Sequence, residues 1–365
     1  MQYCVWFKDL TKNSIPIAGG KGANLGEMYT INLPIPNGFA VTAQTYKQYI
    51  EQTGIKDKIA SLLKDLNVDD TAILQARAKE IQQLIVSTPI PNLIAEDIMD
   101  NYELLGVDKQ ADSLISGKEV FVAVRSSATA EDLPEASFAG QQATYLNIHG
   151  KHKVVAAVLA CWASLFTARA IYYREKNNFS HMKVLISALV QEMINSEQAG
   201  VMFTVNPATN DANETVIEAV YGLGEMIVSG SVNPDLYIID KQSRNIVKKE
   251  VKKQEIGMFR TAEGGNEKRE IAKELQERQV IPDTHIRELA RLGNNIEKHY
   301  GKPMDIEWAI EKDQVFITQA RAVTTFKENK EEDVVIDVKG KVILRGETAS
   351  AGVYSGLVRL IKDPS

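Results

Sequence analysis

The most informative stretch of this chain is Val-Arg-Ser-Ser-Ala-Thr-Ala-Glu-Asp-Leu-Pro-Glu-Ala-Ser-Phe-Ala-Gly-Gln-Gln at residues 124–142. Alternating apolar residues lead into it over 120–124 and out of it over 143–147, which predicts a β-hairpin with a polar loop. Arg125, expected at the end of the first strand, would present a guanidinium fork that suits phosphate oxygens. Backbone N–H groups of the loop could converge on the same oxygens, together with four hydroxyl side chains: Ser126, Ser127, Thr129 and Ser137. An ordinary solvated hairpin loop is the alternative that composition alone permits.

A second pattern suited to anions lies near the N-terminus, where Ala-Gly-Gly-Lys-Gly-Ala-Asn-Leu-Gly-Glu-Met occupies residues 18–28. The glycines give way to a helix-compatible run, so Lys21 is expected at or just before a helix N-terminus. Unpaired N–H groups and the helix dipole favour an anion there. The spacing is not that of a Walker A loop. A capping turn with an exposed lysine is the alternative.

The composition indicates a globular chain, because the 365 residues are 44% hydrophobic and 25% charged, enough for two or three domains or subdomains. A net charge of −6 without a long block of Lys or Arg argues against nucleic acid as a partner. The longest apolar run, 154–166, is too short to span a bilayer, so no membrane partner is expected. Two cysteines, Cys4 and Cys161, make no disulfide framework, and with no secretion signal we expect reduced thiols and a cytoplasmic location.

Hydrophobic periodicity predicts a mixed α+β fold. Helical patterns occupy 42–105, 153–176 and 284–300, the last of them stopping at Gly301. Residues 248–280 are charged and irregular and are expected to form a surface insertion, and 327–333 indicate a linker. Late strands are expected over 184–193, 200–205, 216–220, 236–239, 305–310 and 315–321.

The last two predicted strands carry Asp305 and Glu307 on one and Gln319 and Arg321 on the other. Side chains alternate along a strand, so each pair shares a face, but whether both pairs share the same face depends on the parity of the turn. An odd turn, such as 312–314, would set Glu307 opposite Gln319 and Asp305 opposite Arg321. These groups would then suit Mg²⁺ and the phosphates of a nucleotide. The alternative is a half-buried hairpin whose polar face meets water.

Several of these segments resemble the nucleotide-binding domain of the phosphoenolpyruvate synthase (pyruvate, water dikinase) family. Residues 125–142 are similar, nearly letter for letter, to the family's phosphate-covering loop. The resemblance covers residues 1 to about 325 and includes Gly19 to Glu27, Gln198-Ala-Gly-Val-Met-Phe-Thr-Val-Asn-Pro207, Gly222-Leu-Gly-Glu225, Asn233-Pro-Asp235, His299-Tyr-Gly-Lys-Pro-Met-Asp-Ile-Glu-Trp308 and Ile317-Thr-Gln-Ala-Arg321.

The resemblance implies an α+β fold of the ATP-grasp type, in which two lobes close on the nucleotide. It implies a first lobe with the phosphate loop (1–195), a second lobe with the metal-binding hairpin (196–325), a linker (326–340) and the incomplete beginning of a swivelling phosphohistidine domain (341–365).

It also implies a site for ATP with Mg²⁺ as cofactor. Glu307 and Gln319 would be the metal ligands, and Lys21, Arg125 and Arg321 would be catalytic. The segment Gln191-Glu-Met-Ile194 would hold adenine, although an ordinary strand end is the alternative for each of its residues. The full set of expected ATP-binding residues is Lys21, Arg125, Thr129, Gln191, Glu192, Met193, Ile194, Asp305, Glu307, Gln319 and Arg321.

The family reaction turns ATP, pyruvate and water into AMP, phosphoenolpyruvate and phosphate through a phosphohistidine. The histidines of this chain do not stand in the family's Thr-x-x-His setting and are expected at the surface or in packing: His149, His152, His181, His285 and His299. We therefore expect a fragment that stops before that histidine, with pyruvate and the phosphohistidine domain as partners in the full-length protein.

Some alternatives stay open at this stage. In rifampicin phosphotransferase an antibiotic-binding domain follows the nucleotide domain, and the order of segments here favours the synthase. The phosphate loop of pyruvate, phosphate dikinase has a different sequence, which favours that enzyme less. A non-catalytic nucleotide-binding module, an ATP-grasp ligase and a homo-oligomer are not excluded by the residues.

Overall fold

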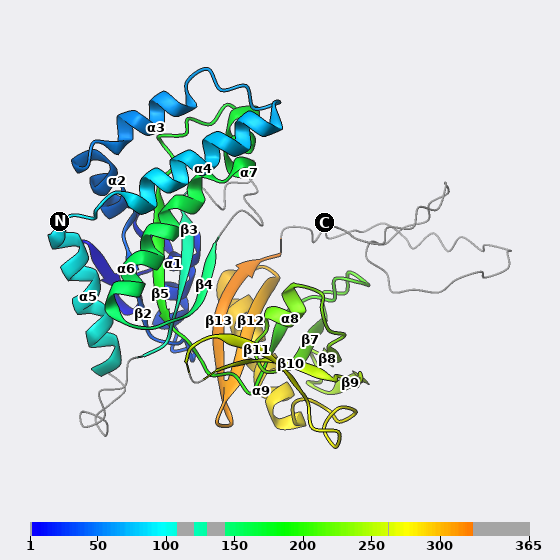
Figure 1. Cartoon of the computed structure of the whole chain (residues 1–365). Coiled ribbons are helices and arrows are strands. Elements are labelled where there is room, and N and C mark those ends of the chain that lie inside the picture. The colour runs from blue at the N-terminus through cyan, green and yellow to red at the C-terminus, as the bar shows by residue number, and fades with distance from the viewer. Residues whose placement is uncertain (1, 108–119, 130–142, 262, 324–365) are drawn as a thin grey trace, which may run out of the picture.

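The computed structural model of the chain describes residues 2–107, 120–129, 143–261 and 263–323. Two sheets form its framework, with neighbouring strands antiparallel, and helices pack against both (Figure 1). The predicted α+β class is confirmed at this level. Ser137, the predicted linker and the predicted beginning of a phosphohistidine domain lie outside the described residues.

The first sheet takes its strands from the N-terminal half of the chain and has the order β1-β2-β5-β3-β4. The second has the order β13-β12-β6-β7-β8-β9, and β10 and β11 form a separate hairpin. The strands are β1 (Cys4–Trp6), β2 (Gly38–Val41), β3 (Val122–Ala128), β4 (Thr144–Ile148), β5 (Ile186–Glu192), β6 (Gln198–Phe203), β7 (Glu214–Tyr221), β8 (Asp235–Asp240), β9 (Ile246–Glu250), β10 (Ile256–Arg260), β11 (Asn266–Glu270), β12 (Met304–Glu311) and β13 (Gln314–Ala322).

The helices start and stop at residues whose local chemistry favours an end. Thr42 before α2 and Asp70 before α4 each accept a backbone N–H of the first turn. Gly301 ends α9 in the left-handed region, with φ of 66°. The helices are α1 (Ile15–Thr30), α2 (Ala43–Gln52), α3 (Ile55–Leu63), α4 (Thr71–Ser87), α5 (Asn92–Val107), α6 (Lys151–Ala163), α7 (Ala168–Lys176), α8 (Glu225–Val228) and α9 (Asp283–Tyr300), with 3-10 turns at Phe7–Asp9, Lys12–Ser14 and Ser164–Phe166.

The prediction of one long helix over 153–176 is wrong. Thr167 has extended backbone angles, ends the turn after α6 and caps α7 by accepting the Ala170 N–H at 3.2 Å. The two helices are bent by 41° relative to each other. Within the described residues no single helix is long and apolar enough to cross a membrane. Only this bent pair, taken together, has the necessary length and composition, and most of α6 is buried in the protein.

Two hydrophobic cores lie on opposite faces of the first sheet. Phe39 and Val41 of β2 point into a core shared with the helices from α2 to α7, whereas Ala40 between them points into the other core. That second core joins α1 to the second sheet and α9. Every strand of the first sheet lies before residue 193 in the chain, and every strand of the second lies after residue 197. The two sheets nevertheless share a core, to which α1 belongs.

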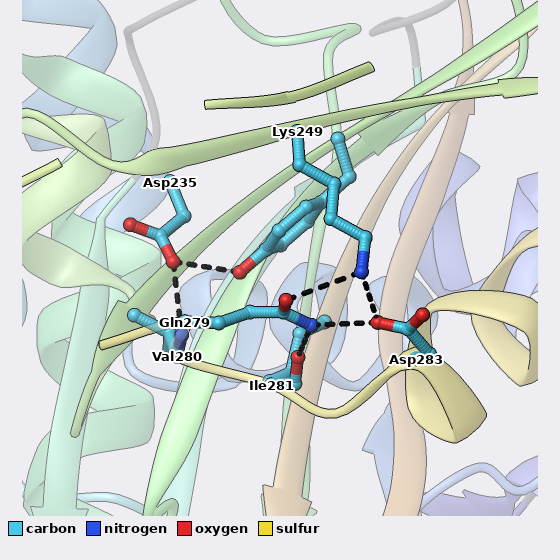
Figure 2. A network of polar contacts seen from close by, with 7 residues as sticks. Asp235, Lys249, Gln279, Val280, Ile281 and Asp283 are labelled. Atoms are coloured by element: carbon cyan, nitrogen blue, oxygen red, sulfur yellow. Dashed lines mark hydrogen bonds and ion pairs between the residues drawn. The ribbon is translucent and has the colours of Figure 1, made fainter. Parts of the chain in front are cut away.

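Residues 248–280, predicted to be irregular, contain the end of β9 and the β10–β11 hairpin. The hairpin strands pair in full register; β11 is exposed along its whole length, whereas β10 carries the partly buried Met258 and Phe259. The segment after the hairpin is tied to α9, because Lys249 and Gln279 both donate to the Asp283 carboxylate (Figure 2). These strands were not predicted from the sequence because the segment contains no long apolar run.

Asp235, from the Asn233-Pro-Asp235 motif, anchors this region to β8. Its carboxylate is fully buried and accepts from the Tyr237 hydroxyl at 2.6 Å and the Val280 N–H at 2.9 Å (Figure 2). The other oxygen accepts from the Lys252 N–H at 2.9 Å. A buried carboxylate satisfied by backbone donors holds distant segments together. This motif therefore has a structural role.

Candidate functional site

A cavity of about 390 Å³ lies between the two sheets. Its walls come from β3, β4 and β5 on one side and from β6, β12 and β13 on the other, and Figure 1 shows β12 and β13 beside β4. Six residues of the predicted ATP site line this one cavity: Arg125, Gln191, Glu192, Met193, Ile194 and Glu307. The structure thus brings together segments more than a hundred residues apart.

Arg125 and Glu307 join the two sheets across the cavity. Arg125 Nη2 lies 2.8 Å from Glu307 Oε2, and Arg125 Nη1 donates to the Thr318 carbonyl at 3.3 Å. Burial alone would raise the pKa of Glu307, but the nearby cations Arg125, Arg321 and Lys21 hold that pKa below its ordinary value. Glu307 is therefore ionised at neutral pH.

Arg125 lies in the middle of β3, not at its end as predicted, because β3 stays paired with β5 as far as Ala128. Ser126 and Ser127 are consequently buried strand residues. The Ser126 hydroxyl bonds to the backbone of Ala143, and the Ser127 hydroxyl accepts the Gly22 N–H at 3.4 Å. The prediction that both serines are loop donors is wrong, since these bonds keep them in the sheet.

Thr129, the last described residue before the polar loop, stays close to the first sheet. Its hydroxyl donates to the Leu185 carbonyl at 3.2 Å, and its N–H bonds to the same carbonyl at 3.0 Å. Thr129 does not line the cavity. Its predicted contact with ATP stays a prediction.

Lys21 lies in α1, just past a sharp kink at Gly19. Gly19, with φ of 69° and ψ of 178°, is not helical and divides Ile15–Thr30 into two helices, so Lys21 lies in the first turn of the second helix, as predicted. A Cβ atom on Gly19 would lie 2.3 Å from Ser127 Oγ, so glycine is required for α1 to approach β3. Lys21 Nζ is 3.5 Å from the Ser126 carbonyl. The kink therefore places Lys21 beside the strand that carries Arg125.

The β12–β13 hairpin has the predicted partners but not the predicted turn. Glu307 is opposite Gln319, and Asp305 is opposite Arg321, which confirms both pairs. The turn, however, contains only Lys312 and Asp313, both with positive φ, since Glu311 pairs with Gln314. The prediction of an odd turn is wrong.

A β-bulge at Thr318 reconciles an even turn with the observed pairs. The register shifts between Glu307 and Trp308, and Trp308 pairs with Ile317. Strict alternation from Gln319 would place Ile317 on the cavity face. The extra residue instead lets Ile317, which is 0% exposed, point to the core while Gln319 stays opposite Glu307.

The predicted adenine segment, 191–194, spans the end of β5. Two of its N–H groups are engaged within the protein, Glu192 with the Asn37 carbonyl at 2.8 Å and Met193 with the Phe121 carbonyl at 2.9 Å. Gln191 is 3% exposed, and its Nε2 has no hydrogen-bond partner among the described residues. A buried unpaired donor on a cavity wall is a group that a ligand acceptor would satisfy.

Asp305 and Arg321 form the next pair on the face that carries Glu307 and Gln319. Arg321 Nη2 lies 2.8 Å from Asp305 Oδ2, with Arg321 61% exposed. Burial raises the pKa of Asp305, Arg321 opposes the rise, and Glu307 adds to it, so the pKa stays above its ordinary value. Neither residue lines the cavity itself.

The donor set fits a metal ion that shares its ligands with a nucleotide. Glu307 and Gln319 supply two oxygens from one face of neighbouring strands. No cluster of three or more His, Cys, Asp or Glu side chains able to hold a metal ion occurs in the part of the chain that the structure describes. Mg²⁺ commonly takes one or two protein oxygens and completes its shell with phosphates and water. The residues therefore suit nucleotide-bound Mg²⁺ better than a dedicated ion site.

Several lining residues carry no prediction from the sequence. Trp308 is buried, and a Cβ atom on Gly200 would lie 2.4 Å from its ring, so the glycine of the Gln198-Ala-Gly segment lets the ring pack there. The Gly222-Leu-Gly-Glu225 segment was recognised as a motif without a role. The unpredicted lining residues are Ala123, Thr144, Leu146, Ser196, Ala199, Gly200, Val201, Leu223, Gly224, Glu225, Trp308, Ala309 and Thr318.

The comparison with known families agrees with this geometry. The model of the pyruvate phosphate dikinase AMP/ATP-binding domain matches residues 15–341. The chain belongs to this family. The match spans the second sheet, the first sheet except β1, the cavity between them and every predicted site residue.

Similar curated proteins include phosphoenolpyruvate synthases. The chain is 47% identical to a probable phosphoenolpyruvate synthase of Methanocaldococcus jannaschii, over 100% of the chain and 30% of that protein. It is 47% identical to one of Archaeoglobus fulgidus, over 98% of the chain and 47% of the relative. It is 42% identical to the phosphoenolpyruvate synthase of Pyrococcus furiosus, over 100% of the chain and 49% of the relative. The chain thus spans about a third to a half of the length of these relatives.

Proposed function

We propose that this domain binds ATP with Mg²⁺ in the cavity between the sheets and donates the pyrophosphoryl group within a phosphoenolpyruvate synthase. The observation that carries the proposal is the Arg125–Glu307 pair, which brings a guanidinium from one sheet and a carboxylate from the other into one cavity. The fold type we propose is ATP-grasp, with the two sheets as its lobes. The names of the relatives favour this activity over rifampicin phosphotransferase.

The geometry suggests how these residues would divide the work. Formation of AMP requires the bond between the α- and β-phosphates to break, so negative charge builds up on the departing and transferring groups. The Arg125 fork and the Lys21 ammonium stand where they could meet that charge. Mg²⁺, when bound, would neutralise phosphate oxygens, and Glu307 with Gln319 would hold it.

The rest of the proposed reaction depends on parts outside the described residues. A histidine would take the pyrophosphoryl group, water would release its terminal phosphate, and the remaining phosphohistidine would pass its phosphate to pyruvate, yielding phosphoenolpyruvate. A cytoplasmic location is proposed with it, and the buried, unpaired thiols of Cys4 and Cys161 are compatible with a reducing compartment.

Calorimetry with ATP, with and without Mg²⁺, tests the proposal directly. The 365-residue chain should bind ATP at up to millimolar nucleotide, and Glu307→Gln should weaken Mg²⁺-dependent binding by about tenfold or more. Glu255→Gln is the matched control, because Glu255 is an exposed residue outside the cavity and should leave binding unchanged. The chain alone should make no phosphoenolpyruvate in a coupled pyruvate assay. Absence of ATP binding, or product formed by the chain alone, would contradict the proposal.

A further inference from the structure

Asn24 belongs to the glycine-rich segment of residues 18–28 but has no role in the function proposed above. It lies in the same helix as Lys21 and three residues after it, which puts both side chains on one side of that helix. The structure describes the whole of this segment, and all its residues are buried except these two, which are partly exposed. Lys21 and Asn24 therefore form a small polar surface on a segment that is otherwise buried.

The edge of β13 lies next to elements of the first sheet. β13 is the outermost strand of its sheet, on the side nearest β4 (Figure 1). An edge strand leaves backbone groups without partners in the sheet. Two β13 carbonyls accept a side-chain donor from outside the sheet: Thr318 from Arg125 Nη1 at 3.3 Å, and Ala320 from Asn24 Nδ2 at 3.5 Å. Asn24 thus extends by two residues the contact that Arg125 makes with this edge.

Ala320 stands between the two side chains of β13 that belong to the proposed site. Gln319 precedes it and Arg321 follows it. Because the Asn24 amide contacts the backbone of Ala320, it fixes the part of the strand from which both side chains extend. Asn24 thereby connects the helix that carries Lys21 directly with the strand that carries Gln319 and Arg321.

Two further hydrogen bonds hold this helix in place. The Gly22 N–H donates to Ser127 Oγ of β3 at 3.4 Å, and the Tyr300 hydroxyl of α9 donates to the Asn24 carbonyl at 3.3 Å. Both attach the helix to elements other than β13. The Asn24 amide adds the attachment to β13, and with it a restraint on the distance between Lys21 and the side chains of that strand.

Such a restraint matters because one ligand would meet groups from both elements. Lys21 is proposed to contact the phosphates of ATP, and Gln319 and Arg321 to contact their Mg²⁺ and their charge. Groups that already stand at the correct separation bind a ligand with less loss of entropy. A misplacement of about 1 Å can cost much of the effect of a charged group. Since Lys21 lies one turn from Asn24, loss of the Asn24 amide should act mainly through Lys21.

We propose that Asn24 is a positioning residue, whose hydrogen bond to the Ala320 carbonyl sets Lys21 at the separation from Gln319 and Arg321 that the phosphates of the nucleotide require. Asn24 itself does not line the cavity. The proposal rests on the proposed function, since it assumes that Lys21 contacts bound ATP.

A double-mutant cycle on ATP binding tests this role. Calorimetry with ATP and Mg²⁺ would compare the unmodified chain, Asn24→Ala, Lys21→Ala and the double variant. Asn24→Ala should weaken binding about fivefold to tenfold, the loss expected for one hydrogen bond and the alignment that it supports. In the Lys21→Ala background the same change should alter the affinity less than about twofold, because the group that Asn24 positions is gone.

Two more variants control for a general effect on folding. Asn24→Leu removes the donor and keeps a side chain of similar size, so it should give the same cycle as Asn24→Ala. Gln44→Ala is the matched control and should leave ATP binding unchanged. Gln44 Nε2 donates to the Pro16 carbonyl at 2.9 Å, which is also a side-chain amide bonded to a backbone carbonyl, but it lies on the other side of the Gly19 kink from Lys21. Thermal unfolding without nucleotide would check that each variant is folded at the temperature of the titration.

Three results would overturn the role of Asn24. One is an unchanged ATP affinity in both Asn24 variants. Another is an equal loss from Asn24→Ala in the unmodified chain and in the Lys21→Ala background, which would mean that Asn24 supports the fold independently of Lys21. The third is an unchanged ATP affinity in Lys21→Ala. Failure of the unmodified chain to bind ATP would instead overturn the proposed function, so the two failures are distinguishable.

Discussion

Arg125 determines much of the charge balance in the cavity. Burial raises the pKa of Glu307, and Arg125 is the main group that lowers it. Arg125 also donates to the Thr318 carbonyl at the bulge. When a nucleotide binds, a guanidinium that pairs with a carboxylate in the free protein can pair with phosphate oxygens instead, because the two acceptors have similar geometry. Its loss should therefore affect group transfer more than folding.

Replacement of Arg125 or Arg321 by Ala in the full-length protein should lower pyrophosphoryl transfer on the order of 10²- to 10³-fold, because each guanidinium is expected to meet charge that develops in the transition state. Arg77→Ala is the control, since Arg77 forms an exposed ion pair on α4. Turnover by rapid quench and thermal unfolding would be measured together. Unchanged turnover in either variant would limit that arginine to a structural role.

Gly19→Ala should destabilise the domain by about 3 kcal/mol or more, because it adds a steric clash to the strain of a positive φ. Gly54→Ala is a matched control: both glycines have φ of 69°, but a Cβ atom on Gly54 would meet nothing within 4 Å, whereas one on Gly19 would lie 2.3 Å from Ser127 Oγ. Gly54→Ala should cost only the backbone strain, about 1 kcal/mol. Equal free energies of unfolding in urea would contradict the close packing of α1 on β3.

At the scale of an element, the β12–β13 hairpin combines two requirements that a regular hairpin with this sequence could not meet. Val315 and Ile317 must face the core, and Gln319 must stay opposite Glu307. With an even turn and no bulge, Glu307 would be opposite Thr318 and not Gln319. The bulge at Thr318 adds one residue to the strand and so meets both requirements.

Deletion of Thr318 should therefore be tolerated, because it leaves a regular ladder with Ile317 in the core and Glu307 still opposite Gln319. Deletion of Phe316 is the matched control. It shortens the same strand by one residue but turns Ile317 towards the cavity and Thr318 towards the core, and burying a hydroxyl in place of an apolar side chain should lower the free energy of unfolding by about 2–4 kcal/mol. The stability of both variants would be measured by thermal unfolding, and equal losses of stability would contradict the assignment of the bulge to Thr318.

At the scale of the whole molecule, two carboxylates connect elements far apart in the sequence. Glu307 pairs with Arg125, and Glu27 of α1 contacts His299 of α9 at 2.7 Å. Burial would raise the pKa of Glu27, but the Lys12 N–H and His299 hold that pKa below its ordinary value. Both carboxylates therefore stabilise the folded arrangement when ionised.

This linkage predicts an acid limb of stability. A carboxyl with a lowered folded pKa contributes stability above its unfolded pKa, about 4.3 for Glu, and loses that contribution as the pH falls through the folded value. The melting temperature should change little between pH 7 and pH 5 from these groups and fall below about pH 4. Glu27→Gln with Glu307→Gln should lower stability at pH 7 and flatten the acid limb. Calorimetric scans against pH test this, and an acid limb of unchanged steepness in the double variant would contradict it.

The pairing of Glu307 with Gln319 was predicted correctly, but from an odd turn that the structure does not have. The α+β class, most strands and the helix ends at Thr42 and Gly301 could be predicted from the sequence alone. These features depend on local signals: periodicity, capping side chains and the alternation of strand faces. Local signals also misled, since the serines after Arg125 have the composition of a loop, yet β3 continues through them. Strand pairing with β5 outweighed that preference.

Tertiary packing determines which distant groups meet. No local pattern shows that Arg125 faces Glu307 across 182 residues, or that Asn24 reaches the Ala320 carbonyl. The bulge of the last hairpin likewise depends on tertiary packing, because Ile317 is buried in the core while Gln319 stays opposite Glu307. Contacts between sheets depend on packing of the whole chain, and that information lies in no single segment.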